Sequence, residues 1–101
     1  MQKILHGKRY NTDSATWKAM YSYGNPSDFN AFSEVLYQKK TGEFFLHGFG
    51  GPMSRYAKQL AYNSFGSGDE IIPLTEEGAR EWCEKYCDFE TYVDIFGNVP
   101  G

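Results

Sequence analysis

The chain has 101 residues, of which 41% are hydrophobic and 18% aromatic, and its formal net charge is −3. This length allows one domain, because two cores would each be too small to be stable alone, and the apolar content excludes a disordered chain. No apolar run of about 18 residues is present, and the N-terminal segment is too short and too polar for a signal peptide. We therefore expect one soluble, cytoplasmic domain over residues 1–101.

The first twenty residues predict a strand pair and a brief helix. Lys3–Tyr10 has β-forming residues on both sides of Gly7, which indicates a hairpin or a broken strand. Thr12 or Asp13 would cap a helix that runs to Met20.

The stretch from Phe32 to Phe49 predicts a β-hairpin around which the fold is built. Phe32–Gln38 forms the first strand, and Lys39–Gly42 suits a tight turn with Gly42 at a positive φ. Glu43–Phe49 returns as the second strand. Because both faces of this returning strand are apolar, we expect it to be central in a sheet.

The following segment is ambiguous. The apolar spacing in Met53–Tyr62 favours a helix, with an extended segment as the alternative, because the glycines at 66 and 68 follow closely. Asp69–Leu74 predicts a short strand with Pro73 at a sheet edge or strand end.

Two helices are predicted at the C-terminal end. Thr75 is a suitable N-cap for the first, and its apolar positions follow the i, i+3, i+4, i+7 pattern of one buried stripe: Ala79, Trp82, Cys83 and Tyr86. A second helix would begin near Asp88 and end at Gly97. The sequence therefore predicts an α+β fold. We expect a small antiparallel sheet centred on Ser33–Phe49, joined by the N-terminal strand and Ile71–Ile72, with both helices on one face.

Charge is distributed unevenly along the chain. Residues 1–58 carry eight Lys and Arg against four Asp and Glu, whereas residues 59–101 carry two against nine. Such an asymmetry produces a dipolar field that steers encounter with a charged partner, provided that folding does not interleave the two halves. An acidic, merely solvated helix face is the alternative interpretation.

The acidic half supplies the main candidate site. Glu77, Glu81 and Glu84 share a helix face at i, i+4 and i+7, opposite the apolar stripe. Their spacing resembles that of charges along a nucleic-acid backbone. We predict that these glutamates, with Asp69 and Glu70 beside them, bind a cationic groove on another protein. Second candidates are Arg55 and Tyr56, on the segment after the glycines, as a partner-binding pair.

Catalytic, metal and phosphate sites have weaker support. His6 and His47 with Cys83 and Cys87 are the residue types of a zinc site, but their spacing is not that of a zinc finger. Acidic neighbours would raise the pKa of Cys83 and oppose a role as a nucleophile. G-F-G-G-P matches no phosphate-loop pattern. We therefore predict no catalytic residue, metal or cofactor.

Nucleic-acid binding is the second function hypothesis. Basic and aromatic residues interleave in the first half, and Lys39, Lys40, Arg55 and Lys58 would be the phosphate contacts. The net acidity of the chain opposes direct binding to nucleic acid.

Three segments resemble a known family: T-G-E-F-F-L-H-G-F-G-G-P-M-S-R-Y-A, I-I-P-L-T-E-E-G-A-R-E-W and Y-V-D-I-F-G, with G-K-R-Y-N-T near the start. The chain is similar to small bacterial proteins carried on phages, plasmids and other mobile elements. By analogy of size, charge and location on mobile elements, the resemblance implies an anti-CRISPR or other anti-defence inhibitor. It would bind a host effector, such as a CRISPR-associated nuclease, and block its nucleic-acid-binding surface without catalysis. Exposed aromatic side chains would also allow a homodimer.

Overall fold

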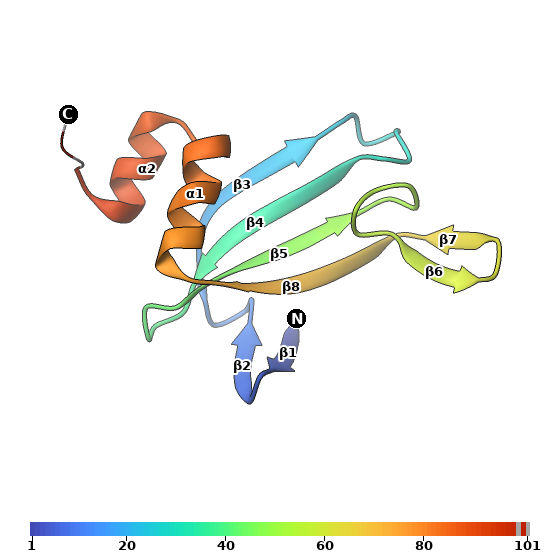
Figure 1. Ribbon diagram of the computed structural model, residues 1–101, viewed down its shortest axis with the longest axis horizontal. Helices are drawn as coiled ribbons and strands as arrows, with labels where there is room; N and C mark the ends of the chain where they lie inside the picture. The colour runs from blue at the N-terminus through green and yellow to red at the C-terminus, as the bar shows by residue number, and fades with distance from the viewer. Residues whose placement is uncertain (99, 101) are drawn as a thin grey trace.

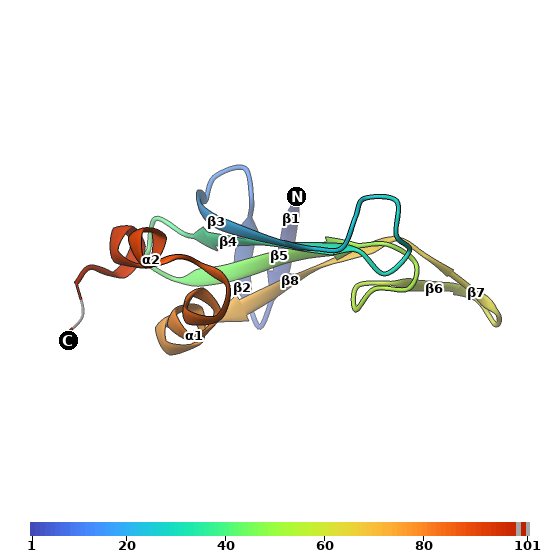
Figure 2. The same ribbon diagram turned by 90° about the horizontal axis from the view of Figure 1, so that it is seen from above.

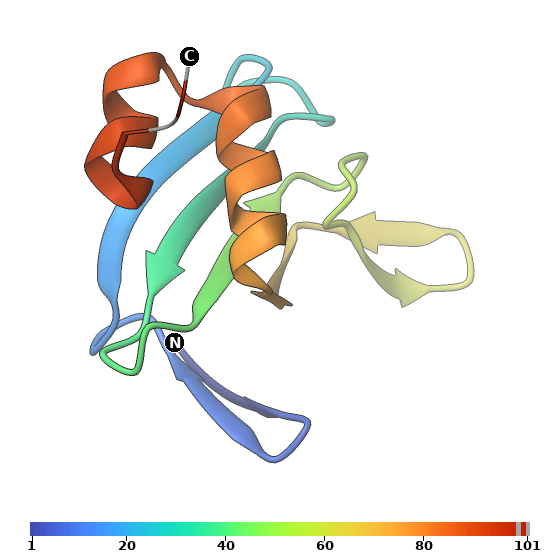
Figure 3. The ribbon, with the colours of Figure 1, turned by 60° about the vertical axis from the view of Figure 1, so that its left-hand side comes forward.

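The computed structural model describes residues 1–98 and 100. Its centre is a four-stranded antiparallel sheet in the order β3 (Thr16–Tyr23), β4 (Phe32–Gln38), β5 (Phe44–Gly50) and β8 (Gly68–Leu74) (Figure 1). Helices α1 (Glu76–Tyr86) and α2 (Phe89–Phe96) follow β8, and both lie on the same face of the sheet (Figure 3). The predicted α+β fold, its central hairpin and its two C-terminal helices are confirmed.

Two further hairpins project from this sheet. The first consists of β1 (Gln2–Leu5) and β2 (Lys8–Asn11), joined by His6 and Gly7, which both have positive φ angles, 54° and 76°. The second consists of β6 (Lys58–Ala61) and β7 (Ser64–Gly66). The prediction that the N-terminal strand joins the main sheet is wrong, because β1 and β2 pair only with each other and β3 lies beside β4 instead.

One predicted helix is a strand, and in the second segment, 53–62, the structure has the extended alternative in part. Residues 16–23 form β3, in which Ala19 and Tyr21 face the helices and Met20 faces the other side, as the strand period of two requires. Residues 53–56 form turns and residues 58–61 form β6. The helical spacing at 53–62 does not mark a buried stripe, since Met53 and Leu60 are exposed and only Tyr56 is buried.

The sheet separates two small cores. On the helix side, Leu36 and Leu46 pack against Ala79, Trp82 and Cys83. On the other side, Tyr10 of β2 packs edge-to-face on Phe45, with ring centroids 5.4 Å apart, next to Ile71. β5 contributes to both cores and is flanked by β4 and β8, which confirms its predicted central position.

The molecule is long and flat. Its principal extents are 50 × 32 × 20 Å, and Figure 2 shows the sheet nearly edge-on, with the helices at one end and the β6–β7 hairpin at the other. The acidic C-terminal elements therefore lie far from this hairpin. Of the six ion pairs among the described residues, only His47–Asp69 joins the basic and acidic halves of the chain.

Candidate protein-binding surface

The outward face of α1 carries a row of carboxylates. The Thr75 side chain caps the helix by accepting a hydrogen bond of 3.0 Å from the Gly78 N–H. This start directs Ala79, Trp82 and Cys83 into the core. The opposite side is exposed and presents the three predicted glutamates together on one helix: Glu77, Glu81 and Glu84. We call these three residues the acidic face.

The basic residues of α1 are directed elsewhere. The Arg80 guanidinium donates to the Tyr92 hydroxyl and to Glu76 at 3.3 Å each, and these bonds raise the pKa of Arg80. The Lys85 ammonium lies 5.2 Å from the centroid of the Tyr86 ring. Within residues 1–98 and 100, no ion pair involves a residue of the acidic face. Their charges therefore point into solvent.

A groove of about 500 Å³ adjoins the acidic face between α1 and the sheet. Glu81 and Lys85 line its helix side, and Glu70, Arg55 and Tyr56 line its sheet side. Its floor is formed by apolar and aromatic side chains, among them Leu46, Ile72, Trp82 and Tyr86. The groove brings together Glu70, Glu81, Arg55 and Tyr56 of the predicted site.

At the base of this groove lies a buried carboxylate, that of Glu34, whose residue is 3% exposed. One oxygen accepts a hydrogen bond of 2.9 Å from the Trp82 indole N–H. The other accepts a short hydrogen bond from the Tyr56 hydroxyl and pairs with Arg55 at 3.4 Å. Burial, followed by the Glu34 contact, raises the pKa of Tyr56, so the phenol stays protonated as a donor. These groups satisfy one another and bind the sheet to α1.

The glycine-rich segment makes room for this cluster. A Cβ atom on Gly48 would lie 1.9 Å from Cζ of Tyr56. The absence of a side chain at Gly48 therefore leaves room for the Tyr56 ring over β5, where its hydroxyl reaches Glu34. Tyr56 is thus a buried structural residue. The Arg55 side chain is about half exposed, and its Cζ atom lies 4.4 Å from the centroid of the Phe32 ring.

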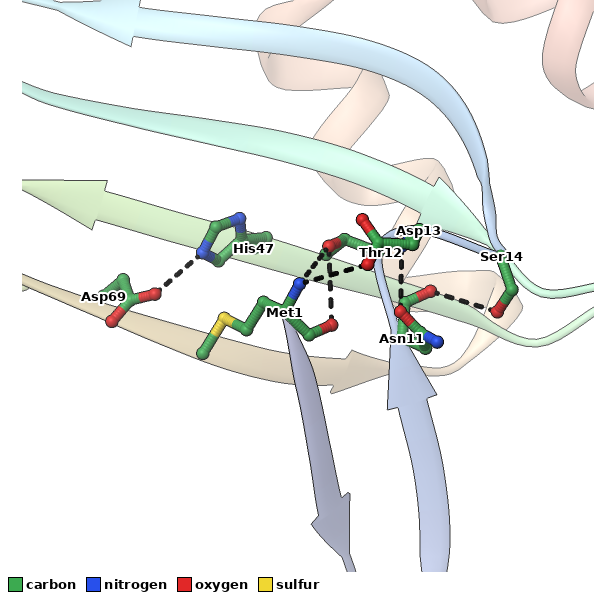
Figure 4. A network of polar contacts seen from close by, with 7 residues as sticks. All are labelled: Met1, Asn11, Thr12, Asp13, Ser14, His47 and Asp69. Atoms are coloured by element: carbon green, nitrogen blue, oxygen red, sulfur yellow. Dashed lines mark hydrogen bonds and ion pairs between the residues drawn. The ribbon is translucent and has the colours of Figure 1, made fainter.

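Asp69 is separated from the acidic face. Neighbouring residues of a strand point to opposite faces, so Glu70 faces the groove and Asp69 the other side of the sheet. There Asp69 pairs with Nε2 of His47 at 3.0 Å (Figure 4). The same figure shows the amino group of Met1 near Thr12, which it contacts at 3.0 Å.

The residues considered for other chemistry are not brought together. His6 lies in the β1–β2 turn, His47 on β5 and both cysteines on α1. In the described part of the chain, no group of three or more metal-ligating side chains is found. Burial, with a hydrogen bond to Cys87, raises the pKa of Cys83 to about 12, which disfavours the thiolate that a nucleophile requires.

The basic residues proposed for nucleic-acid binding are also dispersed. Lys39 and Lys40 lie at one end of β5, and Arg55 and Lys58 follow its other end. A strand of seven residues separates these pairs by roughly 20 Å. Lys39 also contacts Glu43 at 3.7 Å and the Tyr10 ring at 3.8 Å.

Sequence reasoning missed Glu34 and the polar role of Trp82. The signal was present, because strand alternation places Glu34 on the same face as Leu36 in an apolar strand. A charged residue at such a position needs donors nearby. Which donors these are depends on contacts 22 and 48 residues away along the chain, which local patterns do not reveal.

Comparison with models of known protein families, with curated proteins and with solved structures finds no match for this chain. Neither α1 nor α2, the helices of the described residues, has the length and apolar character needed to cross a membrane.

Proposed function

We propose that this protein is a non-catalytic interaction module that binds a cationic groove of another protein through the acidic face of α1. The observation that carries the proposal is the row of three exposed carboxylates without an ion-pair partner among the described residues. Carboxylates about 5–6 Å apart on one helix face complement a row of Lys and Arg. A binding surface for nucleic acid on an effector protein has this chemistry.

The groove beside the acidic face extends this surface. Glu70 and Glu81 flank aromatic side chains there, and these carboxylates with Trp82 and Tyr86 would accept a cationic side chain from the partner beside the groove's own Lys85 and Arg55. The finer form of the proposal is an anti-CRISPR-like inhibitor that occupies the nucleic-acid-binding surface of its effector. That form rests on the sequence resemblance and on the charge pattern.

A structural role for the buried polar groups supports a non-enzymatic function. The Glu34 carboxylate is engaged by three donors, and the raised pKa of Tyr56 keeps its phenol protonated and makes it a weaker acid. In the part of the chain that the structure describes, no buried side-chain nitrogen or oxygen lacks a partner. Groups bonded in this way hold the groove together rather than transfer protons.

The test uses two variants with the same charge. One carries Glu77→Lys, Glu81→Lys and Glu84→Lys; the control carries Asp13→Lys, Glu90→Lys and Asp94→Lys, away from the acidic face. Each reversal adds two charges, so both variants change the formal net charge from −3 to +3. Proteins captured from the native host are identified by mass spectrometry, purified, and titrated with each variant in direct binding assays.

The first variant should lose partner binding and the control should keep it, while both retain the circular dichroism spectrum of the parent chain. Binding of the parent should weaken as salt rises and compete with the nucleic acid of the effector. Persistent binding of the first variant at moderate salt would refute the acidic face as the contact. Retention of oligonucleotides by the isolated protein in a gel shift would favour the nucleic-acid-binding alternative.

A further inference from the structure

The end of the molecule opposite the helices is unusually apolar. Of the β6–β7 hairpin, Leu60 is 63% exposed, Tyr62 89% and Phe65 55%. Phe29 and Met53, in the neighbouring loops, are 67% and 72% exposed. Their loops are joined by a hydrogen bond of 2.8 Å from the Met53 N–H to the Phe29 carbonyl. We call these five side chains the apolar end.

The hairpin lacks a core of its own. No side chain of β6 or β7 is buried, and Figure 1 shows this hairpin extending beyond the main sheet. A two-stranded ribbon that packs against nothing is only marginally stable in water. Covering its three large apolar side chains with another surface would therefore stabilise the hairpin.

We propose that the apolar end is a homodimer interface, in which the β6–β7 hairpins of two copies pack against each other about a two-fold axis. The size of the surface agrees with this occupant. Leu60 lies over Gly66, on the face of the ribbon opposite Phe65. Large side chains present about 150–250 Å² each, so the exposed fractions of the other four correspond to roughly 550 Å² per copy. The smallest specific interfaces bury about 600 Å² per partner, and the backbone of the hairpin adds to the area of these side chains.

Charge also favours a second copy. Lys58, at the start of β6, is the charged residue of the hairpin, and residues 59–66 contain none, so the tips of two hairpins can meet without like-charge repulsion. The acidic helices lie at the other end of a molecule 50 Å long, and this arrangement places the acidic ends of the two copies as far apart as the shape allows. The dimer would thus carry one acidic face near each of its two far ends.

The experiment is sedimentation equilibrium of the full chain over a wide concentration range, with Phe65→Asp as the variant and Phe89→Asp as its control. Phe89 is 75% exposed at the start of α2, at the opposite end, so the control makes the same change on a more exposed ring. The parent chain should show a monomer–dimer equilibrium. Phe65→Asp should weaken it at least about tenfold and Phe89→Asp should leave it unchanged.

A second variant guards against misfolding. Tyr62→Ser removes a side chain that is 89% exposed and so supports nothing within one copy. It should also weaken the dimer while the circular dichroism spectrum stays the same. A parent chain that remains monomeric at every concentration would overturn the proposal. So would a dimer that Phe65→Asp and Tyr62→Ser leave intact, or one that Phe89→Asp disrupts equally.

This inference does not rest on the proposed function, and the two can fail separately. Reversal of the acidic face should leave the dimer intact, and Phe65→Asp should leave capture of the partner protein intact. Loss of partner binding in Phe65→Asp would instead assign the apolar end to the partner.

Discussion

One buried carboxylate organises the contacts between the sheet and α1. Glu34 receives hydrogen bonds from Tyr56 and Trp82 and an ion pair from Arg55, three residues from two distant parts of the chain. A buried charge is tolerated only when donors of this kind replace its water. The groove beside the acidic face keeps its shape because these bonds position both of its walls.

Glu34→Ala should therefore lower the free energy of unfolding by about 3 kcal/mol, because it leaves the buried indole N–H and phenol without an acceptor. Chemical denaturation monitored by tryptophan fluorescence measures the change. Glu84→Ala, which truncates an exposed glutamate, should stay within about 0.5 kcal/mol of the parent. Equal losses in the two variants would show that the Glu34 cluster contributes little.

Gly48→Ala tests the space that the Tyr56 ring occupies. Because the new Cβ would overlap the ring, we expect a loss of about 2 kcal/mol in unfolding free energy. The loss should shrink in a Tyr56→Leu background, where the ring is absent, and a double-mutant cycle measures this coupling. Gly42→Ala reports backbone strain alone, since Gly42 has a φ of 98° and no atom within 4 Å of the added Cβ.

At the scale of elements, the cap of α2 makes its stability depend on pH. Asp88 accepts a hydrogen bond of 2.8 Å from the Thr91 N–H, and bonds with the Thr91 side chain and backbone lower the pKa of Asp88 below its ordinary 3.8. A lowered pKa means that the folded helix favours the ionised carboxylate. The contribution of the cap is therefore complete above the unfolded value and is lost as the pH falls through the lower, folded value.

We expect the amide signals of α2 to remain unchanged in NMR spectra from neutral pH down to about 4 and to shift at lower pH as the helix start frays. Asp88→Asn keeps an acceptor that does not titrate, so its α2 signals should lose most of this acid dependence. A parent and a variant that respond identically to acid would contradict the assignment of Asp88 as the controlling group.

The elements that sequence reasoning predicted correctly are those whose signals are local. The caps of α1 and α2 and the turn at Gly42 are marked by residues within a few positions of one another. The segments predicted as helices at 12–20 and 53–62 failed because β3 and the turn at Tyr56 are held by distant contacts. Tyr56 is buried by Glu34 and Gly48, and no local periodicity reports those partners.

The same distinction applies to the candidate site. The acidic face follows from helical spacing alone and was predictable, whereas the separation of Asp69 from Glu70 depends on which face of β8 meets α1. The apolar end was not predicted, since the apolar spacing of Met53–Tyr62 favoured a helix. Its exposure emerges only because the hairpin folds away from both cores.

At the scale of the whole molecule, stability should be uneven. The main sheet and α1 share buried side chains on both faces, whereas β6 and β7 have none, so the hairpin should open far more readily than the sheet. Hydrogen exchange read by mass spectrometry should show fast exchange of residues 58–66 and slow exchange of β4 and β5 at low protein concentration.

Raising the concentration should slow exchange in residues 58–66 if copies associate there, because hydrogen bonds that are covered by a second chain open less often. Phe65→Asp should abolish this concentration dependence and leave exchange in β4, β5 and α1 unchanged, and Phe89→Asp should retain it. Protection that appears in α1 on concentration, with residues 58–66 unaffected, would place self-association at the acidic end. That result would contradict the proposal that the protein self-associates through the apolar end and binds its partner through the acidic face.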